Sequence, residues 1–526
     1  MKRQFTLAGI LCLLAIGVSL AQGVSGYETT SDGNFEDGTF ILNEGWFGHD
    51  GGSINFITAD GDIMYNVQQN EVKDFFFGNT SCCGTVYGGK LYVMSKQANG
   101  ESGRLVVMDA KTLKLLKSVS ELNGGDGRSV VGVNPHKVYL GTSTGVVTFD
   151  VDNMQVGDLI QGTYDSETNS RQTGDMVKAG RYVFALQQGT GVHVIDTETD
   201  MTVETIEDAD VQGIAQSADG NVWIASKATL TCVDPATLEE VETLTLPEGA
   251  QIMCQWGSWR PTAFCASRTE NVLYWNQGGS WIGGNEFYRY EIGSDISTLK
   301  PFFTIYGLPA ADDTKTQQAY GVARYDDRTG QLVVLTTQSG YGANYEHNWI
   351  HLVNGATGKL EKTVTLDEYY WFPTLPIFPD KYAPEFVGVE NKVGLEENGQ
   401  PYAVDLAGKV TDRDNIAYNI TLSLAGEGDP SVADARLEGT TLTIAPVAEG
   451  TTTVTLAAES NGVVTELPIA VSVGASTGIG CVEAGNGGAT EVARFTVDGK
   501  KLDRPQPGVN IVRMSDGTVR KVVVGR

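Results

Sequence analysis

Short segments in which apolar and polar residues alternate run along most of this chain, and turns rich in glycine, asparagine and aspartate separate them. Residues 88–119 are a clear example, with an alternating strand, a loop, a second strand that ends in an acidic turn, and a third strand. Alternation with a period of two is typical of β-strands that bury one face. The chain is therefore predicted to be all-β. The same plan makes seven units, which begin at Gly38, Gly88, His136, Arg181, Gly220, Asn271 and Gly330.

Each unit except the first is preceded by a short apolar strand, such as residues 129–133 or 213–217. Four strands per repeat at a spacing of roughly 40–60 residues is the pattern of a β-propeller blade. Residues 374–378 form an apolar strand after the last unit and have no unit of their own, so we expect them to pair with the first unit and close the ring. The pattern predicts a seven-bladed β-propeller over residues 38–380.

The C-terminal third continues the β pattern with a different spacing. Residues 381–473 hold about seven short alternating strands, which predicts an immunoglobulin-like or cadherin-like β-sandwich. Its acidic stretch at residues 412–415 fits either a Ca²⁺ site, because hard cations take several oxygen ligands, or a solvated turn. A linker rich in glycine and alanine covers residues 474–490, and residues 491–526 are expected to form a small C-terminal β domain.

The first 21 residues have the features of a secretory signal: two basic residues, an apolar run, and small residues before a cleavage site after Ala21. No other segment approaches the roughly 20 apolar residues of a membrane-spanning helix, so we predict an exported chain without a transmembrane segment. Cys12 lies inside the apolar run, which leaves a lipid-anchored N-terminus as the alternative.

The charge balance excludes some classes of partner. The chain has 37 basic and 65 acidic side chains and a formal net charge of −28, which repels phosphate backbones and anionic lipid. Nucleic acid is therefore not an expected partner. Export permits disulfides, and the adjacent Cys82 and Cys83 fit a strained bridge on a loop as well as they fit two thiols or two separate bridges.

Aromatic side chains concentrate in the loops of one predicted propeller face. The loops between the second and third strands and the links between blades emerge on that face, and the other turns are short and polar. A concave aromatic face with a few polar groups is the default expectation for a binding site. Residues 75–77 and 369–371 are interpreted as packing within links. The predicted ligand-binding residues are Trp46, Phe47, Arg128, Arg171, Gln172, Trp259, Arg260, Trp281, Tyr320, Tyr341 and Tyr345.

Motifs for catalysis or metal binding do not stand out. His347 and His351 flank a predicted strand, where positions four apart are separated by about 13 Å at roughly 3.3 Å per residue, so they cannot share a zinc ion. No CxxC pair, phosphate-binding glycine loop or GxSxG elbow occurs. We therefore predict no catalytic residue, metal or cofactor and favour binding over catalysis, with a secreted propeller hydrolase or lyase as an alternative.

Two regions resemble known families. The repeat, with "LNEGWFG" at its start and "YYWFPTLPIFPD" at its end, is similar to the YncE-like surface propellers of gut bacteria, a group that includes a cobalamin-capturing propeller. This resemblance implies a cell-surface protein that captures a bulky ligand such as a corrinoid beside an outer-membrane transporter. A surface adhesin or glycan-binding protein is the alternative. The last 35 or so residues, with "VDGKKL", "PGVNIV" and the terminal "KVVV", resemble a type IX secretion sorting domain, which implies transport across the outer membrane.

Overall fold

The computed structural model describes residues 35–100, 102–164, 172–253, 261–278, 283–475, 490–515 and 517–524. Nearly all regular structure in these ranges is β-strand, and the predicted all-β class is confirmed. No helix in this part of the chain is long and apolar enough to span a membrane. The helices that occur are short 3-10 segments: η1 (Val67–Gln69), η3 (Ile296–Thr298), η4 (Gly342–Glu346) and η5 (Ala417–Asn419).

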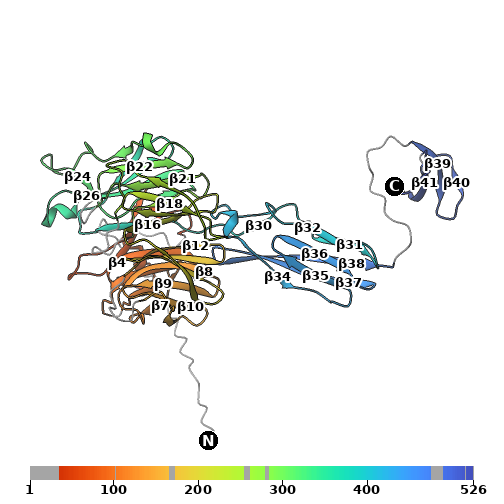
Figure 1. Ribbon diagram of the computed structural model, residues 1–526, viewed down its shortest axis with the longest axis horizontal. Helices are drawn as coiled ribbons and strands as arrows, with labels where there is room; N and C mark the ends of the chain where they lie inside the picture. Colours follow the sequence, from red (N-terminus) through yellow and green to blue (C-terminus); the bar gives the residue numbers. More distant parts are fainter. Residues whose placement is uncertain are drawn as a thin grey trace, which may run out of the picture.

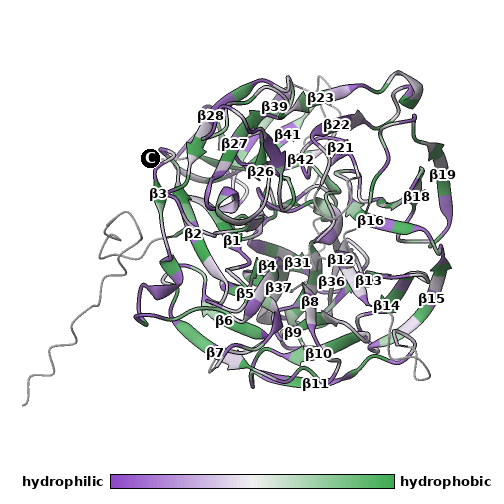
Figure 2. Cartoon of the chain, turned by 90° about the vertical axis from the view of Figure 1, so that its left-hand side faces the viewer, coloured by the Kyte–Doolittle hydropathy of each residue, from purple (hydrophilic) through white to green (hydrophobic). Residues whose placement is uncertain are grey.

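Seven antiparallel sheets follow one another along residues 38–377 of the described chain and lie around a common centre, as Figure 2 shows. In the first sheet, the strands follow one another from centre to rim in the order β29 (Pro373–Ile377), β1 (Gly38–Asn43), β2 (Ser53–Thr58) and β3 (Ile63–Met64). The next sheets are β4 (Asn79–Tyr87), β5 (Lys90–Gln97), β6 (Leu105–Asp109) and β7 (Leu115–Val119), then β8 (Gly127–Asn134), β9 (Lys137–Thr142), β10 (Val146–Asp150) and β11 (Gln155–Leu159).

The remaining four sheets repeat this order. They are β12 (Thr173–Ala179), β13 (Tyr182–Gln187), β14 (Gly191–Asp196) and β15 (Met201–Glu207); β16 (Val211–Gln216), β17 (Val222–Ser226), β18 (Thr229–Val233) and β19 (Glu240–Thr245); β20 (Cys265–Ala266), β21 (Val272–Asn276), β22 (Glu286–Glu291) and β23 (Pro301–Thr304); and β24 (Gln317–Ala319), β26 (Gln331–Gln338), β27 (Asn348–Asn354) and β28 (Leu360–Thr365). In the last of them β25 (Arg324–Asp326) also pairs with β26. This propeller-like arrangement of four-stranded sheets agrees with the predicted repeat.

The first sheet joins the two ends of the ring. β1 pairs with β2 on one side and with β29 on the other, so that Phe40 lies opposite Ile377 and Leu42 opposite Leu375. The predicted pairing of residues 374–378 with the first unit is confirmed. As a result, loops at the start of this region lie next to the links at its end.

The position of a strand within its sheet explains its sequence. All five residues of the middle strand β17, VWIAS, are buried, whereas most residues of the outer strand β19, EVETLT, are exposed. Neighbouring sheets pack face to face, so a middle strand meets apolar side chains on both sides, and an outer strand borders the solvent. Middle strands therefore appear in the sequence as continuous apolar runs.

Residues 385–474 form a second β unit. One sheet contains β31 (Lys392–Glu396), β38 (Val463–Gly474), β37 (Gly450–Ser460) and β34 (Thr421–Gly426), and another contains β32 (Tyr402–Asp405), β36 (Thr441–Pro446) and β35 (Ala433–Glu438). Ile444 from one sheet and Leu456 from the other belong to the same buried core. β30 (Glu385–Phe386) pairs with β33 (Val410–Thr411). A separate small sheet contains β40 (Lys501–Leu502), β39 (Glu491–Thr496), β41 (Gly508–Met514) and β42 (Val519–Val524).

The second unit packs against the short turns on one face of the ring (Figure 1). The Gly180 amide donates a hydrogen bond of 3.2 Å to Asn419 Oδ1. The ring of Tyr418 covers Gly180 and Gly220, and a Cβ atom at either glycine would come within 2.9 Å of that ring. Gly220 also has a φ of +96°, which residues with a side chain rarely adopt. Both the backbone conformation and the contact with Tyr418 therefore favour glycine at this position. The second unit thus covers one end of the ring, and the long aromatic loops lie at the other.

Candidate functional site: an aromatic cluster at the open face

Three segments bring aromatic side chains together on the face opposite the second unit, which is the face turned to the viewer in Figure 2. They are the β1–β2 loop (residues 44–52), the β26–β27 loop (residues 339–347) and the link from β28 to β29 (residues 366–372). The pairing of β1 with β29 makes the last sheet a neighbour of the first. Ring closure is therefore the reason that loops distant in sequence meet in one sector.

The rings of these segments, together with one from the inner strand region, form a continuous series of contacts that we name the aromatic cluster. The centroids of Trp46 and Tyr370 are 4.1 Å apart, and those of Tyr370 and Phe372 are 6.1 Å apart. The centroid of Phe372 lies 5.5 Å from those of Tyr320 and Tyr345. The centroids of Tyr341 and Tyr345 are 6.3 Å apart. Such separations are those of favourable aromatic pairs. The members of the cluster are Trp46, Tyr320, Tyr341, Tyr345, Tyr370 and Phe372.

Trp46 is held in a stack of three rings. Its centroid lies 3.5 Å from that of His49 at an interplanar angle of 17°, and 4.1 Å from that of Tyr370 at 23°. Two rings that are both nearly parallel to the indole at such short distances must lie on opposite faces of it. A tight turn fixes the stack, because the Trp46 amide donates to Asp50 Oδ1 at 2.6 Å. A ligand can therefore reach the edge of Trp46 but neither of its faces.

Phe372 occupies the centre of the cluster in an unusual backbone conformation. Its φ is +51°, in the left-handed region that bulky side chains rarely adopt. Its carbonyl accepts a hydrogen bond of 3.0 Å from the Glu44 amide, and its ring contacts those of Tyr320, Tyr345 and Tyr370. Such a conformation costs on the order of 1–3 kcal/mol and persists only where its surroundings enforce it. The surrounding rings and this hydrogen bond enforce it here.

Exposure separates the rings that support the cluster from those that reach solvent. Tyr341 is 79% exposed and Phe47, next to Trp46 in the chain, is 64% exposed. Tyr320 and Tyr345 are buried, as is Trp371 beneath the cluster. The open face therefore presents two prominent rings on a base of buried aromatic side chains.

Carboxylates hold the phenol groups at the edge of the cluster. Tyr369 Oη donates a hydrogen bond to Asp50 Oδ2. Burial, followed by this bond, raises the pKa of Tyr369. The pKa of Tyr370 is raised chiefly by its hydrogen bond to Glu346. Both phenols stay protonated at neutral pH, and acidic oxygen atoms lie beside the rings.

The other predicted ligand-binding residues are distributed less compactly. Tyr320 Oη donates to Glu44 Oε2 at 3.3 Å, and Gln172 Nε2 donates to Gln188 Oε1 at 3.2 Å. Arg128 is half-buried near the start of the inner strand β8. Four predicted residues lie outside the described ranges: Arg171, Trp259, Arg260 and Trp281.

Sequence analysis missed two members of the cluster. Residues 369–371 were interpreted as packing within the closing link, and Trp371 does pack there, with its Nε1 donating to the Asp367 carbonyl at 2.9 Å. Tyr370 and Phe372 instead join the aromatic cluster. The left-handed backbone of Phe372 and the turn at Tyr369 separate the two pairs, and no local sequence pattern signals them.

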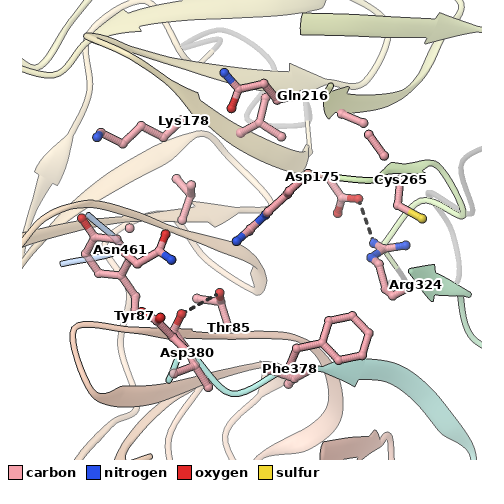
Figure 3. Close-up of a pocket in the computed structure, with 18 of the residues that line it drawn as sticks. Thr85, Tyr87, Asp175, Lys178, Gln216, Cys265, Arg324, Phe378, Asp380 and Asn461 are labelled. Carbon is pink, nitrogen blue, oxygen red and sulfur yellow. Dashed lines mark hydrogen bonds and ion pairs between the residues drawn. The ribbon is translucent and has the colours of Figure 1, made fainter. Parts of the chain in front are cut away.

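A cavity of about 400 Å³ occupies the other end of the central channel (Figure 3). Its walls come from the inner strands β4, β8, β12, β16, β20 and β29 together with β25. Residues of the second unit close it: Asp414, Asn415, Ile416, Asn419 and Asn461. No local pattern indicates this cavity, because it exists only where the second unit covers the ring.

Most charged groups in the wall of this cavity are paired. Arg324 Nη2 lies 3.4 Å from Asp175 Oδ2, and Arg328 Nη2 lies 2.8 Å from Asp326 Oδ2. Arg268 Nη1 donates a hydrogen bond of 2.5 Å to a backbone carbonyl of the second unit. These pairs neutralise one side of the cavity.

His351 and the adjacent Cys82 and Cys83 have structural surroundings. His351 Nε2 lies 2.8 Å from Gln317 Oε1, and its Nδ1 lies 2.9 Å from Thr363 Oγ1. Burial lowers the pKa of His351 to about 4. Cys82 and Cys83, for which a bridge and free thiols were both open, are buried free thiols. Within the described residues, no group of three or more His, Cys, Asp or Glu side chains is arranged to hold a metal ion.

A family model described as "Domain of unknown function (DUF5074)" matches residues 37–379, the part of the chain that forms the ring. The chain belongs to this family. The matched region contains the whole aromatic cluster and ends just before Asp380. No protein of curated function matches the chain.

Comparison with solved structures found similarities at low sequence identity. A quinonprotein alcohol dehydrogenase-like protein from Bacteroides thetaiotaomicron is 17% identical, with a TM-score of 0.50 over 66% of this chain and 79% of that one. A computationally designed protein, Ika8, is 12% identical, with a TM-score of 0.39 over 66% of this chain and 94% of that one. The first similarity supports the fold alone.

Proposed function

We propose that this chain is an exported, non-enzymatic binding protein that captures a bulky ligand at the aromatic cluster. The observation that supports the proposal is the cluster itself. Six rings are held by mutual contacts, and two rings, Tyr341 and Phe47, leave most of their surface to solvent. Covering exposed apolar surface is favourable by about 25 cal/mol per Å². A ligand with a flat apolar face would cover this surface, in which Tyr341 contacts the buried ring of Tyr345 and Phe47 follows the stacked Trp46.

The proposal includes the architecture in its finer form. The seven sheets are taken as the blades of a seven-bladed, YncE-like β-propeller over residues 38–380, and residues 381–473 as an immunoglobulin-like sandwich. Residues 1–21 are a signal peptide, residues 474–490 a linker, and residues 491–526 a type IX sorting domain that leads the protein across the outer membrane. In this arrangement the sandwich closes one end of the propeller and leaves the aromatic face free for a ligand.

A corrinoid is the first ligand to test. Cobalamin is a large ring with apolar faces and peripheral amides, and the open face offers exposed rings together with polar side chains such as Gln172 and Arg128. An outer-membrane transporter would then be the partner that receives the ligand.

Calorimetric titration of the purified protein with cyanocobalamin tests this proposal. The variant Phe47→Ala/Tyr341→Ala should lose at least tenfold in affinity and keep its melting temperature, because both side chains are exposed. Tyr306→Ala is the matched control, since Tyr306 is 63% exposed and lies outside the aromatic cluster. Equal affinity in the double variant and the control would contradict a site at the cluster.

A glycan is the second candidate, because carboxylates lie beside the rings. Asp50 and Glu346 both hydrogen-bond to phenols at the edge of the cluster. Exposed rings that stack on sugar faces, with acidic oxygens nearby for hydroxyl groups, are a suitable combination. Absence of heat with cyanocobalamin, together with glycan binding that the double variant loses, would select this candidate.

A further inference from the structure

Two charged side chains in the cavity between the ring and the second unit lack a partner of opposite charge. Among the described residues, none forms a hydrogen bond or ion pair with Lys178 Nζ, and Glu459 acts on it only from a greater distance. Burial lowers the pKa of Lys178. Both carboxylate oxygens of Asp380 are buried and accept no hydrogen bond. Burying oxygen atoms without a hydrogen-bond donor is costly and requires an explanation, and the half-buried Lys178 lies in the same cavity.

Asp380 belongs to a group of three interacting acids, of which Asp380 and Asp414 line the cavity. Asp412 Oδ2 and Asp414 Oδ1 are also buried without a hydrogen-bond donor. Burial, and then the charge of Asp414, raises the pKa of Asp380 to about 8. The group therefore holds a proton at neutral pH, although the charge of Arg268 in the same cavity lowers the pKa of Asp380. A bound cation would stabilise the ionised form instead.

Two elements of the ring place Lys178 and Asp380 in the same cavity. Lys178 lies on β12, and Asp380 follows β29. Figure 3 shows both on the left side of the cavity, with Tyr87 and Asn461 between them, and the Asp175–Arg324 pair on the right. The side with unpaired charges is thus distinct from the neutralised one.

The Asn461 turn completes this side. Asn461 lies between β37 and β38 with a φ of +48°, and its carbonyl accepts a hydrogen bond of 2.8 Å from the Gly88 amide. Tyr87 Oη donates to Glu459 Oε1 at 3.3 Å. These contacts fix the second unit against β4, so the distance between the cationic and acidic ends of the cavity is set by the docked units.

We propose that the cavity is a second binding site, and that its ligand is a small zwitterion of the amino acid or short peptide class. The ammonium group of the ligand would lie against Asp380 and Asp414, and its carboxylate against Lys178, with the Asn461 amide as a further hydrogen-bonding group. At ~30 Å³ per water, the cavity has space for on the order of ten water molecules, which suits a ligand of this size. The site is separate from the aromatic cluster and does not depend on it.

Calorimetric titration of the full chain with 6-aminohexanoate and with glycylglycine tests the site. Hexanoate and hexylamine serve as matched probes that carry one charge each. We expect both zwitterions to bind at least tenfold more tightly than either single-charge probe. Binding should also release protons near pH 7, because the ammonium group replaces the proton held by the acids. The number of protons released per bound ligand is obtained from binding heats measured in buffers of different ionisation enthalpy.

Substitutions then assign the two ends. Lys178→Met should remove the advantage of the zwitterions over hexylamine, and Asp380→Asn should remove their advantage over hexanoate and abolish proton release. Lys227→Met, an exposed lysine away from the cavity, should change nothing. Melting temperatures identify any variant that fails to fold, and Asn461→Ala then provides a second variant at the cavity.

Three results would overturn the proposal. The first is no heat from either zwitterion at high protein concentration. The second is zwitterion binding that neither Lys178→Met nor Asp380→Asn weakens. The third is Ca²⁺ binding that Asp380→Asn abolishes while the zwitterions do not bind, which would make the three acids a cation site alone.

Discussion

The two ends of the ring use loops of different kinds. At the open face, long loops between the second and third strands carry the exposed rings of Phe47 and Tyr341, and also Trp46, whose two faces are covered by His49 and Tyr370. At the covered face, short turns such as those at Gly180 and Gly220 accept the ring of Tyr418 from the second unit. Both faces are built from the same repeat, so loop length decides which of them can present a surface to a ligand and which can hold another unit.

The comparison extends to the chemistry of the two ends. The open face has rings that contact one another and carboxylates that accept hydrogen bonds from phenol groups. The covered face has a cavity lined by a basic and an acidic side chain, Lys178 and Asp380, that form no ion pair. An apolar ligand suits the first environment and a charged one suits the second, because burial strengthens electrostatic interactions.

Trp371→Ala should have the largest effect on stability and tests which rings of the open face are structural. Trp371 is 1% exposed, so we expect a loss of about 3–5 kcal/mol in the free energy of unfolding. Chemical denaturation measures this, with Tyr341→Ala as the exposed control that should change stability by less than about 0.5 kcal/mol. Similar losses in the free energy of unfolding of both variants would contradict the division into buried structural rings and exposed rings that are available to a ligand.

Asp380→Asn should have the next largest effect, at the covered face, and the effect should depend on pH. The pKa of Asp380 is raised to about 8 in the folded state, so its contribution to stability is present at low pH and is lost as pH rises toward 8. The variant should match the wild type near pH 4 and gain a progressively higher melting temperature up to about pH 8. Asp313→Asn, at an exposed loop, is the control and should show no such trend.

His351→Gln provides a reference for a titrating group away from both faces. The pKa of His351 is lowered to about 4, so its neutral form stabilises the fold above about pH 6.5, and this contribution is lost as pH falls toward 4. The variant should be less stable at pH 7.5, and its difference from the wild type should shrink on acidification. The effect should be smaller than that of Asp380→Asn, because the pKa shift is smaller. Calorimetry from pH 7.5 to 4.5 measures it, and a difference between variant and wild type that stays constant over this range would contradict the prediction.

Tyr418→Ala should have the smallest effect on global stability, by about 1 kcal/mol, because its side chain is 39% exposed. Its local effect should be clear: amide hydrogen exchange at the turns of residues 180 and 220 should become faster. Exchange at those turns that stays unchanged would show that other contacts hold the second unit. Val464→Ala, an exposed position on β38, is the control.

Much of the fold was predictable because it rests on local patterns. Alternation revealed the strands, and the unpaired strand at residues 374–378 revealed the closure that β29 and β1 form. The sector in which the aromatic loops meet follows from closure. The roles of single rings did not follow, since Trp46 belongs to a stack that His49 and Tyr370 cover on both faces.

The sequence by itself determined the all-β class, the repeat, the closing strand and the face that carries the aromatic loops, because each depends on residues near one another in the chain or on a single periodic rule. Only the tertiary structure decided that Tyr341 is exposed while Tyr345 is buried, and that Phe372 lies at the centre of the cluster. It alone also placed Lys178 and Asp380 in one cavity. Exposure and unpaired charge depend on packing between segments far apart in sequence, and no local pattern records that packing.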